Sequence, residues 1–270
     1  MRENFKNKKR IVIKIGTSSL SYANGRLNFQ RIANLAYVLS SLRSQNLEII
    51  LVSSGAIGVG AGRLGLINKP LELAKKQALA AIGQAELIKI YQKFFEEYNQ
   101  TVAQVLLTKD IVTIPGRHLN ARNTILKLIE MGIIPIINEN DTISTYEIEF
   151  GDNDTLSANV AQLVQADLLI LLSDIDGLYS ADPKKEDKAE IIREVDVITP
   201  ELEKLASGTG TSFGTGGMIT KISAAKICID ANIDTIITNG NDPSIIFDVL
   251  EGKEVGTHFV ANNKSVILKN

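Results

Sequence analysis

The stretch Ile11-Val12-Ile13-Lys14-Ile15-Gly16-Thr17-Ser18 begins as an apolar strand and ends in a glycine followed by hydroxyl side chains. Apart from Lys14, its first five residues are all apolar, without alternation of polar and apolar side chains. A strand of this kind is typical of a parallel sheet that is covered on both faces. Five more apolar runs of strand length follow, at residues 48–53, 102–107, 133–138, 168–173 and 235–238.

Helical patterns separate most of these runs, at residues 29–45, 71–98, 119–131, 155–165 and 218–231. The succession of strand and helix predicts an α/β fold with a mainly parallel central sheet and helices on both faces. Residues 142–150 break this rhythm, because polar and apolar side chains alternate there, and they predict a small antiparallel hairpin or lid. No linker marks a clean domain boundary, although one lobe could give way to another at residues 172–175.

The composition is that of an ordinary globular chain. Of its 270 residues 44% are hydrophobic, and the formal net charge of −2 excludes a whole-molecule basic field for nucleic acid. We interpret the basic tail of residues 1–10 as a frayed, solvated terminus. Its charged members are Arg2, Lys6, Lys8, Lys9 and Arg10. With no apolar run long enough to span a membrane and no cleavable signal, we expect a cytoplasmic protein.

Cysteine and histidine are too scarce for several kinds of catalytic site. Cys228 is the only cysteine, and its apolar surroundings in the sequence predict a buried structural thiol. His118 and His258 are the only histidines, which excludes a multi-histidine metal centre and leaves almost no material for a serine–histidine–acid triad.

Polar and glycine-rich residues gather where the predicted strands end. Ser53-Ser54-Gly55-Ala56, Asn138-Glu139-Asn140-Asp141 and Ser173-Asp174 each follow or close a strand. Ligands of open parallel sheets bind beyond the carboxyl ends of the strands, so these segments predict one site. Lys14 is expensive to bury without a partner. Either its stem snorkels to the edge of the sheet, or, as we favour, it faces a phosphate, with Gly16 allowing close approach of the backbone.

Two glycine-rich segments suit anion binding. Gly55 and residues 58–62 predict a flexible turn with free backbone N–H groups. The pattern Gly60-x-Gly62-x-x-Gly65 lies too far past its strand to be a dinucleotide fingerprint. Residues 208–217 lack Walker spacing but lead into a helix that carries Thr220 and Lys221 in its first turn. They predict a polyphosphate cradle, the alternative being a disordered loop.

The segment Gly151-Asp152-Asn153-Asp154-Thr155 opens a predicted helix. One of its polar residues is expected to be the N-cap. Three polar side chains in succession exceed what capping needs, so the others are candidates for substrate recognition.

Together these segments resemble the amino acid kinase family. The matching stretches, in the family's order, are Val12-Ile13-Lys14-Ile15-Gly16-Thr17-Ser18, Ser53-Ser54-Gly55-Ala56, Asn138-Glu139-Asn140-Asp141, Gly151-Asp152-Asn153-Asp154, Asp176-Gly177-Leu178-Tyr179 with Ala181-Asp182-Pro183, and Gly214-Thr215-Gly216-Gly217-Met218 with Thr220-Lys221. Six motifs in order are specific where one would be weak. The resemblance implies a three-layer α/β/α sandwich over residues 11–270, in which residues 11–171 bind the amino acid and residues 172–260 bind ATP.

The resemblance also implies roles for single residues. Lys14 and Lys221 match the family's two phosphate-stabilising lysines, and Asp174 matches the aspartate that organises them. The expected positions for binding the amino acid are Ser54, Asn138, Asp141, Asp152 and Asn153. The expected nucleotide contacts are Lys14, Gly16, Ser173, Asp174, Thr215, Gly216, Gly217, Met218, Ile219, Thr220 and Lys221. No metal ligand from the protein is expected, because Mg²⁺ enters with ATP.

Two departures from the family's pattern stand out. Glu149 occupies a position where members commonly have a lysine, and the chain stops short of the C-terminal PUA module that many members carry. Any function tied to that module is not expected here, whereas catalysis does not need it.

Within the family the chain is most similar to members that transfer the γ-phosphate of ATP to the γ-carboxylate of L-glutamate, the first step of proline biosynthesis. Asp141 supports this interpretation, because a carboxylate can pair with the ammonium of a free amino acid. The alternatives are a family enzyme for N-acetylglutamate, aspartate or UMP, and a nucleotide-binding regulatory or storage protein without turnover. The resemblance further implies feedback inhibition by proline and a homo-oligomer, and we expect neither nucleic acid nor membrane as a partner.

Overall fold

The computed structural model describes residues 3–22, 26–66, 72–144, 153–181, 183, 186, 188–207 and 217–261. In chain order the elements are η1 (Glu3–Asn7), β1 (Arg10–Ile15), α1 (Thr17–Leu20), α2 (Phe29–Ser44), β2 (Glu48–Ser53), α3 (Ala56–Arg63), α4 (Leu73–Glu96), β3 (Val102–Leu107), η2 (Lys109–Ile111), α5 (Pro115–Glu130), β4 (Ile134–Glu139), α7 (Asn153–Leu163), β5 (Leu168–Ser173), β6 (Glu194–Val195), α8 (Pro200–Ser207), α9 (Met218–Asp230), β7 (Asp234–Asn239), α10 (Ile245–Leu250) and β8 (Thr257–Phe259).

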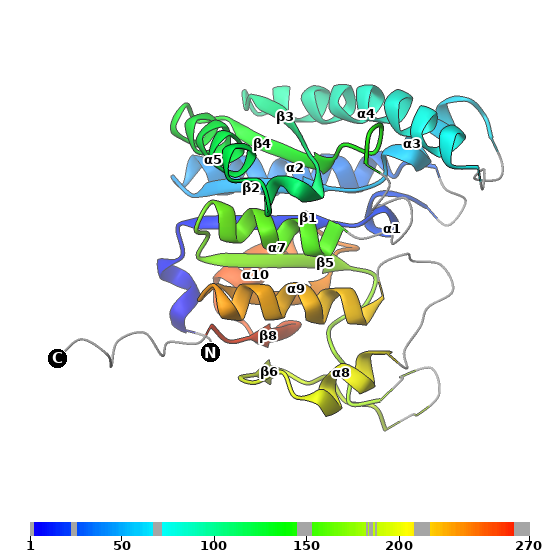
Figure 1. Ribbon diagram of the computed structural model, residues 1–270. Helices are drawn as coiled ribbons and strands as arrows, with labels where there is room; N and C mark the ends of the chain where they lie inside the picture. The colour runs from blue at the N-terminus through cyan, green and yellow to red at the C-terminus, as the bar shows by residue number, and fades with distance from the viewer. Residues whose placement is uncertain are drawn as a thin grey trace.

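The strands of the described part form one sheet in the order β3-β4-β2-β1-β5-β7-β8-β6. Neighbouring strands from β3 to β7 are all parallel, β8 is antiparallel to β7, and β6 is parallel to β8. The central strand β1 pairs with β2 on one side and β5 on the other, so the two predicted lobes share one continuous sheet. The predicted fold class, a mainly parallel sheet between layers of helices, is confirmed (Figure 1).

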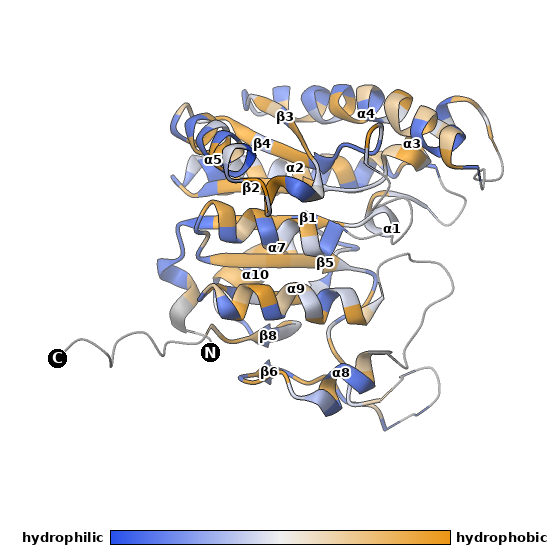
Figure 2. Cartoon of the chain, in the orientation of Figure 1, coloured by the Kyte–Doolittle hydropathy of each residue, from blue (hydrophilic) through white to orange (hydrophobic). Residues whose placement is uncertain are grey.

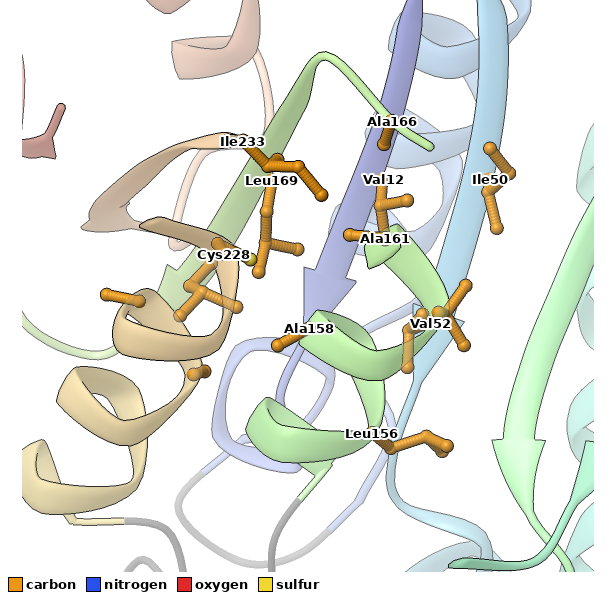
Figure 3. Packing of buried hydrophobic residues seen from close by; sticks show 14 of the residues in the cluster. Val12, Ile50, Val52, Leu156, Ala158, Ala161, Ala166, Leu169, Cys228 and Ile233 are labelled. Carbon is orange, nitrogen blue, oxygen red and sulfur yellow. The ribbon is translucent and has the colours of Figure 1, made fainter. Parts of the chain in front are cut away.

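Two buried clusters lie on opposite faces of the sheet, because successive side chains of a strand point to opposite sides. Val12, Ile50 and Leu169 belong to the cluster under α5, α7 and α9. Ile11 and Ile13 belong to the cluster under α2, α4 and α10. Figure 3 shows the first of these clusters, in which side chains of α7 and α9 pack on the central strands.

The strands lie where the apolar runs predicted them. β5 is buried along its whole length, and it is drawn as a hydrophobic ribbon between helices in Figure 2. Its residues, Leu168–Ser173, are those predicted from the sequence. Cys228 of α9 is fully buried, and burial raises the pKa of its thiol to about 12. The prediction of a buried structural thiol is confirmed.

The N-terminal segment differs from the prediction. Phe5 of η1 is only 1% exposed. The ammonium Nζ of Lys8 lies 2.7 Å from Asp234 Oδ2, and Arg10 Nε lies 2.7 Å from Glu48 Oε2. The interpretation of this basic stretch as frayed and solvated is therefore wrong for residues 3–10, because an apolar anchor and partner carboxylates dock it against the sheet.

The glycine-rich stretch after β2 also differs from the prediction. Gly55 has φ of +104°, a left-handed conformation that suits glycine, and the next eight residues form α3. Residues 58–62 are thus helical rather than a turn with free N–H groups. Of the predicted hairpin, residues 142 and 143 lie in a turn, and residues 145–150, with Glu149, lie outside the described residues. None of the described helices is both long enough and apolar enough to cross a bilayer.

Candidate active site

The centre of the candidate site is a trio of buried charged side chains from three elements. Lys14 lies two residues after Val12 on β1, so its side chain faces α7 and α9. Its Nζ is 2.6 Å from Oδ1 of Asp154, the second residue of α7. Lys221, in the first turn of α9, places its Nζ 3.1 Å from Oδ2 of the same aspartate. The two lysines are 207 positions apart in the sequence, and one carboxylate brings them together.

Burial makes this arrangement electrostatically strong. Asp154 is 0% exposed, Lys14 7% and Lys221 5%. Burial alone would raise the pKa of Asp154, but the charges of Lys14 and Lys221, with hydrogen bonds from Lys14 and Thr220, hold it at about 2. The carboxylate therefore stays ionised at any physiological pH. Since two ammonium groups share one carboxylate, the trio carries a net positive charge in a desolvated place, which suits an anionic ligand.

Asp174 does not occupy the position that the resemblance implied for it. Its side chain is exposed beyond the end of β5, and its Oδ1 accepts a hydrogen bond from Ser173 Oγ at 3.2 Å. The aspartate paired with both lysines is Asp154. The physical reason is the pleat: Lys14 faces the helix layer, where α7 begins, whereas Asp174 has already left the sheet. In this structure the aspartate that holds the two lysines together is therefore Asp154, and not Asp174 as the resemblance implied.

Asn153 joins the two strand ends predicted to bind the acceptor. Its Nδ2 lies 3.0 Å from the carbonyl oxygen of Ser53, 2.8 Å from Ser54 Oγ and 2.8 Å from Asn138 Oδ1. Within the described residues, Oδ1 of Asn153 and Nδ2 of Asn138 are buried without a hydrogen-bond partner. An unmade hydrogen bond at a buried polar atom is costly, so one acceptor and one donor are available to a polar ligand here.

Asp141 lies close by in the sequence, in the turn that follows β4. It is 2% exposed. The structure thus brings Ser54, Asn138 and Asn153 into one cluster. It also buries Asp141, which follows β4, the strand that carries Asn138. Asp152 lies outside the described residues.

The nucleotide side of the prediction is described only in part. Gly217 caps α9 with extended backbone. Thr220 Oγ1 lies 2.7 Å from the carbonyl oxygen of Gly217 and 2.8 Å from Asp154 Oδ2, two acceptors that share its one proton. Met218 is buried whereas Ile219 is 40% exposed. The position where Gly16 would carry a Cβ lies 3.6 Å from Lys14 Nζ, an ordinary contact distance, so the backbone at Gly16 runs next to the ammonium. Thr215 and Gly216 lie outside the described residues.

Sequence reasoning named Asp154 only as part of a polar helix start. The signal that could have found it is the pair of buried lysines. Two cations predicted to converge in a desolvated site need at least one anion from the protein, and Asp154 is the acidic residue in the first turn of α7.

Residues 9–239 match the profile of the Amino acid kinase family. The chain belongs to this family. A relative in the family, the glutamate 5-kinase of Listeria innocua, is 54% identical over 268 residues, which cover 98% of this chain and 97% of that protein. The glutamate 5-kinase of Clostridium perfringens is 52% identical over 265 residues, covering 97% and 98%.

Solved structures of other amino acid kinase folds are more distant. UMP kinase from Bacillus anthracis superposes with a TM-score of 0.61 at 16% identity, covering 94% of this chain and 97% of that one. UMP kinase from Ureaplasma parvum superposes with a TM-score of 0.63 at 18% identity, and the match covers 94% of this chain and 99% of that one. At these identities the likeness shows the fold alone.

Proposed function

We propose that this chain transfers the γ-phosphoryl group of ATP to the γ-carboxylate of L-glutamate, forming L-glutamyl 5-phosphate and ADP, the first step of proline biosynthesis. The observation that carries the proposal is the buried Lys14–Asp154–Lys221 trio, with Asn153, the neighbour of Asp154 in the chain, bonded to Ser54 and Asn138. The 54% identity to the Listeria innocua glutamate 5-kinase over nearly the full length supports glutamate as the acceptor.

The reaction needs no base from the protein. A carboxylate is already ionised and nucleophilic at neutral pH, so an oxygen of the γ-carboxylate attacks the γ-phosphorus in line. The bond from that phosphorus to the bridging oxygen breaks, and ADP leaves with the electron pair. Catalysis therefore rests on positioning the reactants and neutralising charge.

The two lysines supply that neutralisation. An ammonium about 4 Å from a phosphoryl oxygen contributes roughly 4 kcal/mol at an effective dielectric constant near 20. Only the part of this attraction that grows in the transition state accelerates the reaction. Lys14 and Lys221 contact the same carboxylate from two sides, so both can turn toward one phosphoryl group with Asp154 as their shared anchor.

We assign the acceptor to the polar cluster of Ser54, Asn138 and Asn153, with Asp141 following Asn138 after β4. The buried acceptor and donor atoms on Asn153 and Asn138 can pair with the polar ends of an amino acid. The carboxylate of Asp141 can pair with the ammonium of free glutamate, which N-acetylglutamate lacks.

ATP is assigned to the other side of the trio. Ser173, Asp174 and the start of α9 line that side, and the N-terminus of a helix favours phosphate. Mg²⁺ accompanies ATP as part of the substrate. By the same family resemblance, the enzyme is cytoplasmic and homo-oligomeric, and free proline competes with glutamate for the acceptor site.

The proposal is tested by measuring ADP release with glutamate, N-acetylglutamate, aspartate and UMP, and by trapping the acyl phosphate with hydroxylamine. The expected result is hydroxamate formation and ADP release with glutamate, well above the other acceptors. A preference for another acceptor would replace the substrate assignment. ATP binding without turnover on any acceptor would show a regulatory or storage protein instead.

A further inference from the structure

The longest described helix, α4, contacts Ser53 and Ala56, on either side of the proposed acceptor residue Ser54. Neither the reaction nor the ligand contacts proposed above involve this helix. Leu79, Gly83, Leu87, Tyr91 and Phe95 recur every four residues along one buried stripe of this helix. Leu87, Tyr91 and Phe95 of this stripe pack on the face of the sheet opposite the lysine trio, and Leu79 and Gly83 lie against α3. A buried stripe of this kind ordinarily belongs only to the core, so the contacts of its small residue, Gly83, and its polar residue, Tyr91, decide whether the helix has a further role.

Gly83 brings the backbones of α3 and α4 into direct contact. A Cβ at Gly83 would lie 1.7 Å from the carbonyl oxygen of Ala56, and one at Gly60 would lie 2.1 Å from the carbonyl oxygen of Leu79. Distances this short cannot be relieved by rotating a side chain, because the atoms that are met belong to the backbone. Ala56 is the first residue of α3 and directly follows Ser54 and Gly55. The crossing of the two helices therefore fixes the position of residues 53–56, the segment that contains Ser54 and that we call the acceptor loop.

Tyr91 holds the same loop from its other end. The Tyr91 hydroxyl is fully buried and lies 2.8 Å from Ser53 Oγ, within a hydrogen bond. Ser53 is the last residue of β2, and its carbonyl oxygen accepts from Asn153. One helix thus contacts both ends of residues 53–56, the segment that contains Ser54.

We infer that Gly83 and Tyr91 are positioning residues for the acceptor substrate: α4 acts as a backing that sets residues 53–56 against Asn153, without touching the nucleotide side. The inference rests on the proposed function, in which Ser54 and Asn153 bind glutamate. It also explains one of the glycines that follow β2. Gly60 permits the helix crossing, whereas a Cβ at Gly62 would meet nothing within 4 Å.

Placing the acceptor accurately matters because small displacements are costly in a reaction that depends on positioning. If α4 positions only residues 53–56, disturbing this helix should weaken the binding of glutamate far more than the binding of ATP. A helix that serves only as core would instead change both substrates together, or change stability alone.

The test compares two substitutions with matched controls in the full chain. Gly83→Ala is expected to raise KM for glutamate by about tenfold or more, with KM for ATP within about twofold of wild type. Gly62→Ala, the same change at a helical position with open space, is the control and should leave both KM values unchanged. Tyr91→Phe removes only the hydroxyl and should raise KM for glutamate about 3–10-fold. Its control is Tyr37→Phe, at a tyrosine that is 48% exposed.

Equal changes in the two KM values, or no change in either for both Gly83→Ala and Tyr91→Phe, would overturn the inference. Should Gly83→Ala fail to fold, Tyr91→Phe decides alone. The two proposals fail in different ways. If the wild-type enzyme does not turn over glutamate, the proposed function is wrong, and the same comparison is made with the acceptor that it does turn over.

Discussion

Asp154 joins Lys14 and Lys221, the two lysines to which the proposed reaction assigns charge neutralisation. Its two carboxylate oxygens are occupied by different ammonium groups, at 2.6 and 3.1 Å, and its pKa of about 2 keeps it charged. In the proposed reaction this one carboxylate holds both ammonium groups in place, and the more negatively charged phosphoryl group binds between them. A buried charge that loses its partner is expensive, so each member of the trio depends on the others.

Replacing Asp154 should disable the reaction more than replacing Asp174. Asp154→Asn keeps the shape of the side chain but removes the charge that anchors both lysines, so kcat should fall by about 10²–10³, as when one preorganised donor is lost from a transition-state site. Asp174→Asn is the comparison, because that carboxyl is exposed and bonds Ser173. Steady-state rates of the two folded variants measure the difference. A larger loss in Asp174→Asn would return the organising role to that residue.

Asp141 should govern affinity for the acceptor. Its buried carboxylate is proposed to pair with the ammonium of glutamate, so Asp141→Ala should raise KM for glutamate by about tenfold or more, while KM for ATP changes little. Initial rates at varied glutamate and varied ATP separate the two effects. An unchanged KM for glutamate would remove Asp141 from the acceptor site.

At the scale of elements, the site is made by the starts of helices and the ends of strands. The pleat of β1 turns Lys14 toward α7 and α9, and the first turns of those helices supply Asp154 and Lys221. The site lies at the carboxyl ends of the parallel strands, whereas η1 directly precedes the start of β1. Phe5 of η1 packs its ring edge-on against His258, with the ring centroids 4.9 Å apart.

The docking of η1 should be measurable as stability. Phe5 is 1% exposed, so Phe5→Ala is expected to lower the free energy of unfolding by about 3–5 kcal/mol, the range for buried phenylalanines. Phe29→Ala is the control, because Phe29 is 54% exposed, and should cost less than about 1 kcal/mol. Denaturant titration of both variants gives the values. Equal small losses would mean that η1 is not held to the sheet in solution.

At the scale of the whole molecule, sequence was most informative where burial left no choice. β2 and β5 have the predicted bounds because strands buried on both faces are apolar almost throughout. The edge strand β3 also has the predicted bounds, although it is only partly buried. α3 was missed because glycines at residues 58, 60 and 62 weaken a helical pattern. The crossing with α4 explains the glycine at residue 60, where a Cβ would clash with the backbone of Leu79. Lys14 and Lys221 were predicted from their motifs, but pairing with Asp154 depends on three-dimensional register, which local pattern does not contain.

The stability of the whole molecule should fall in acid over a defined range. Burial would raise the pKa of Asp234, but hydrogen bonds from His258, Lys8 and the Ala261 N–H, with the charge of Lys8, hold it at about 2, against 3.8 for the free side chain. A lowered pKa contributes stability above the unfolded value, and that contribution is lost as the pH falls from about 4 to about 2. The same sign holds for Asp154.

Asp234→Asn should therefore lower stability at neutral pH and also flatten its decline between pH 4 and pH 2, by roughly 1–2 kcal/mol. Urea unfolding at several pH values checks this. A variant whose decline with acid is as steep as that of the wild type would show that Asp234 is not paired in the native state.

A crystal structure with glutamate, Mg²⁺ and a non-hydrolysable ATP analogue tests the central claim most directly. We predict that the Nζ atoms of Lys14 and Lys221 both lie within about 4 Å of oxygens of the γ-phosphate, with Asp154 behind them. Lysines that point away from the nucleotide, or phosphates bound at a different edge of the sheet, would contradict it.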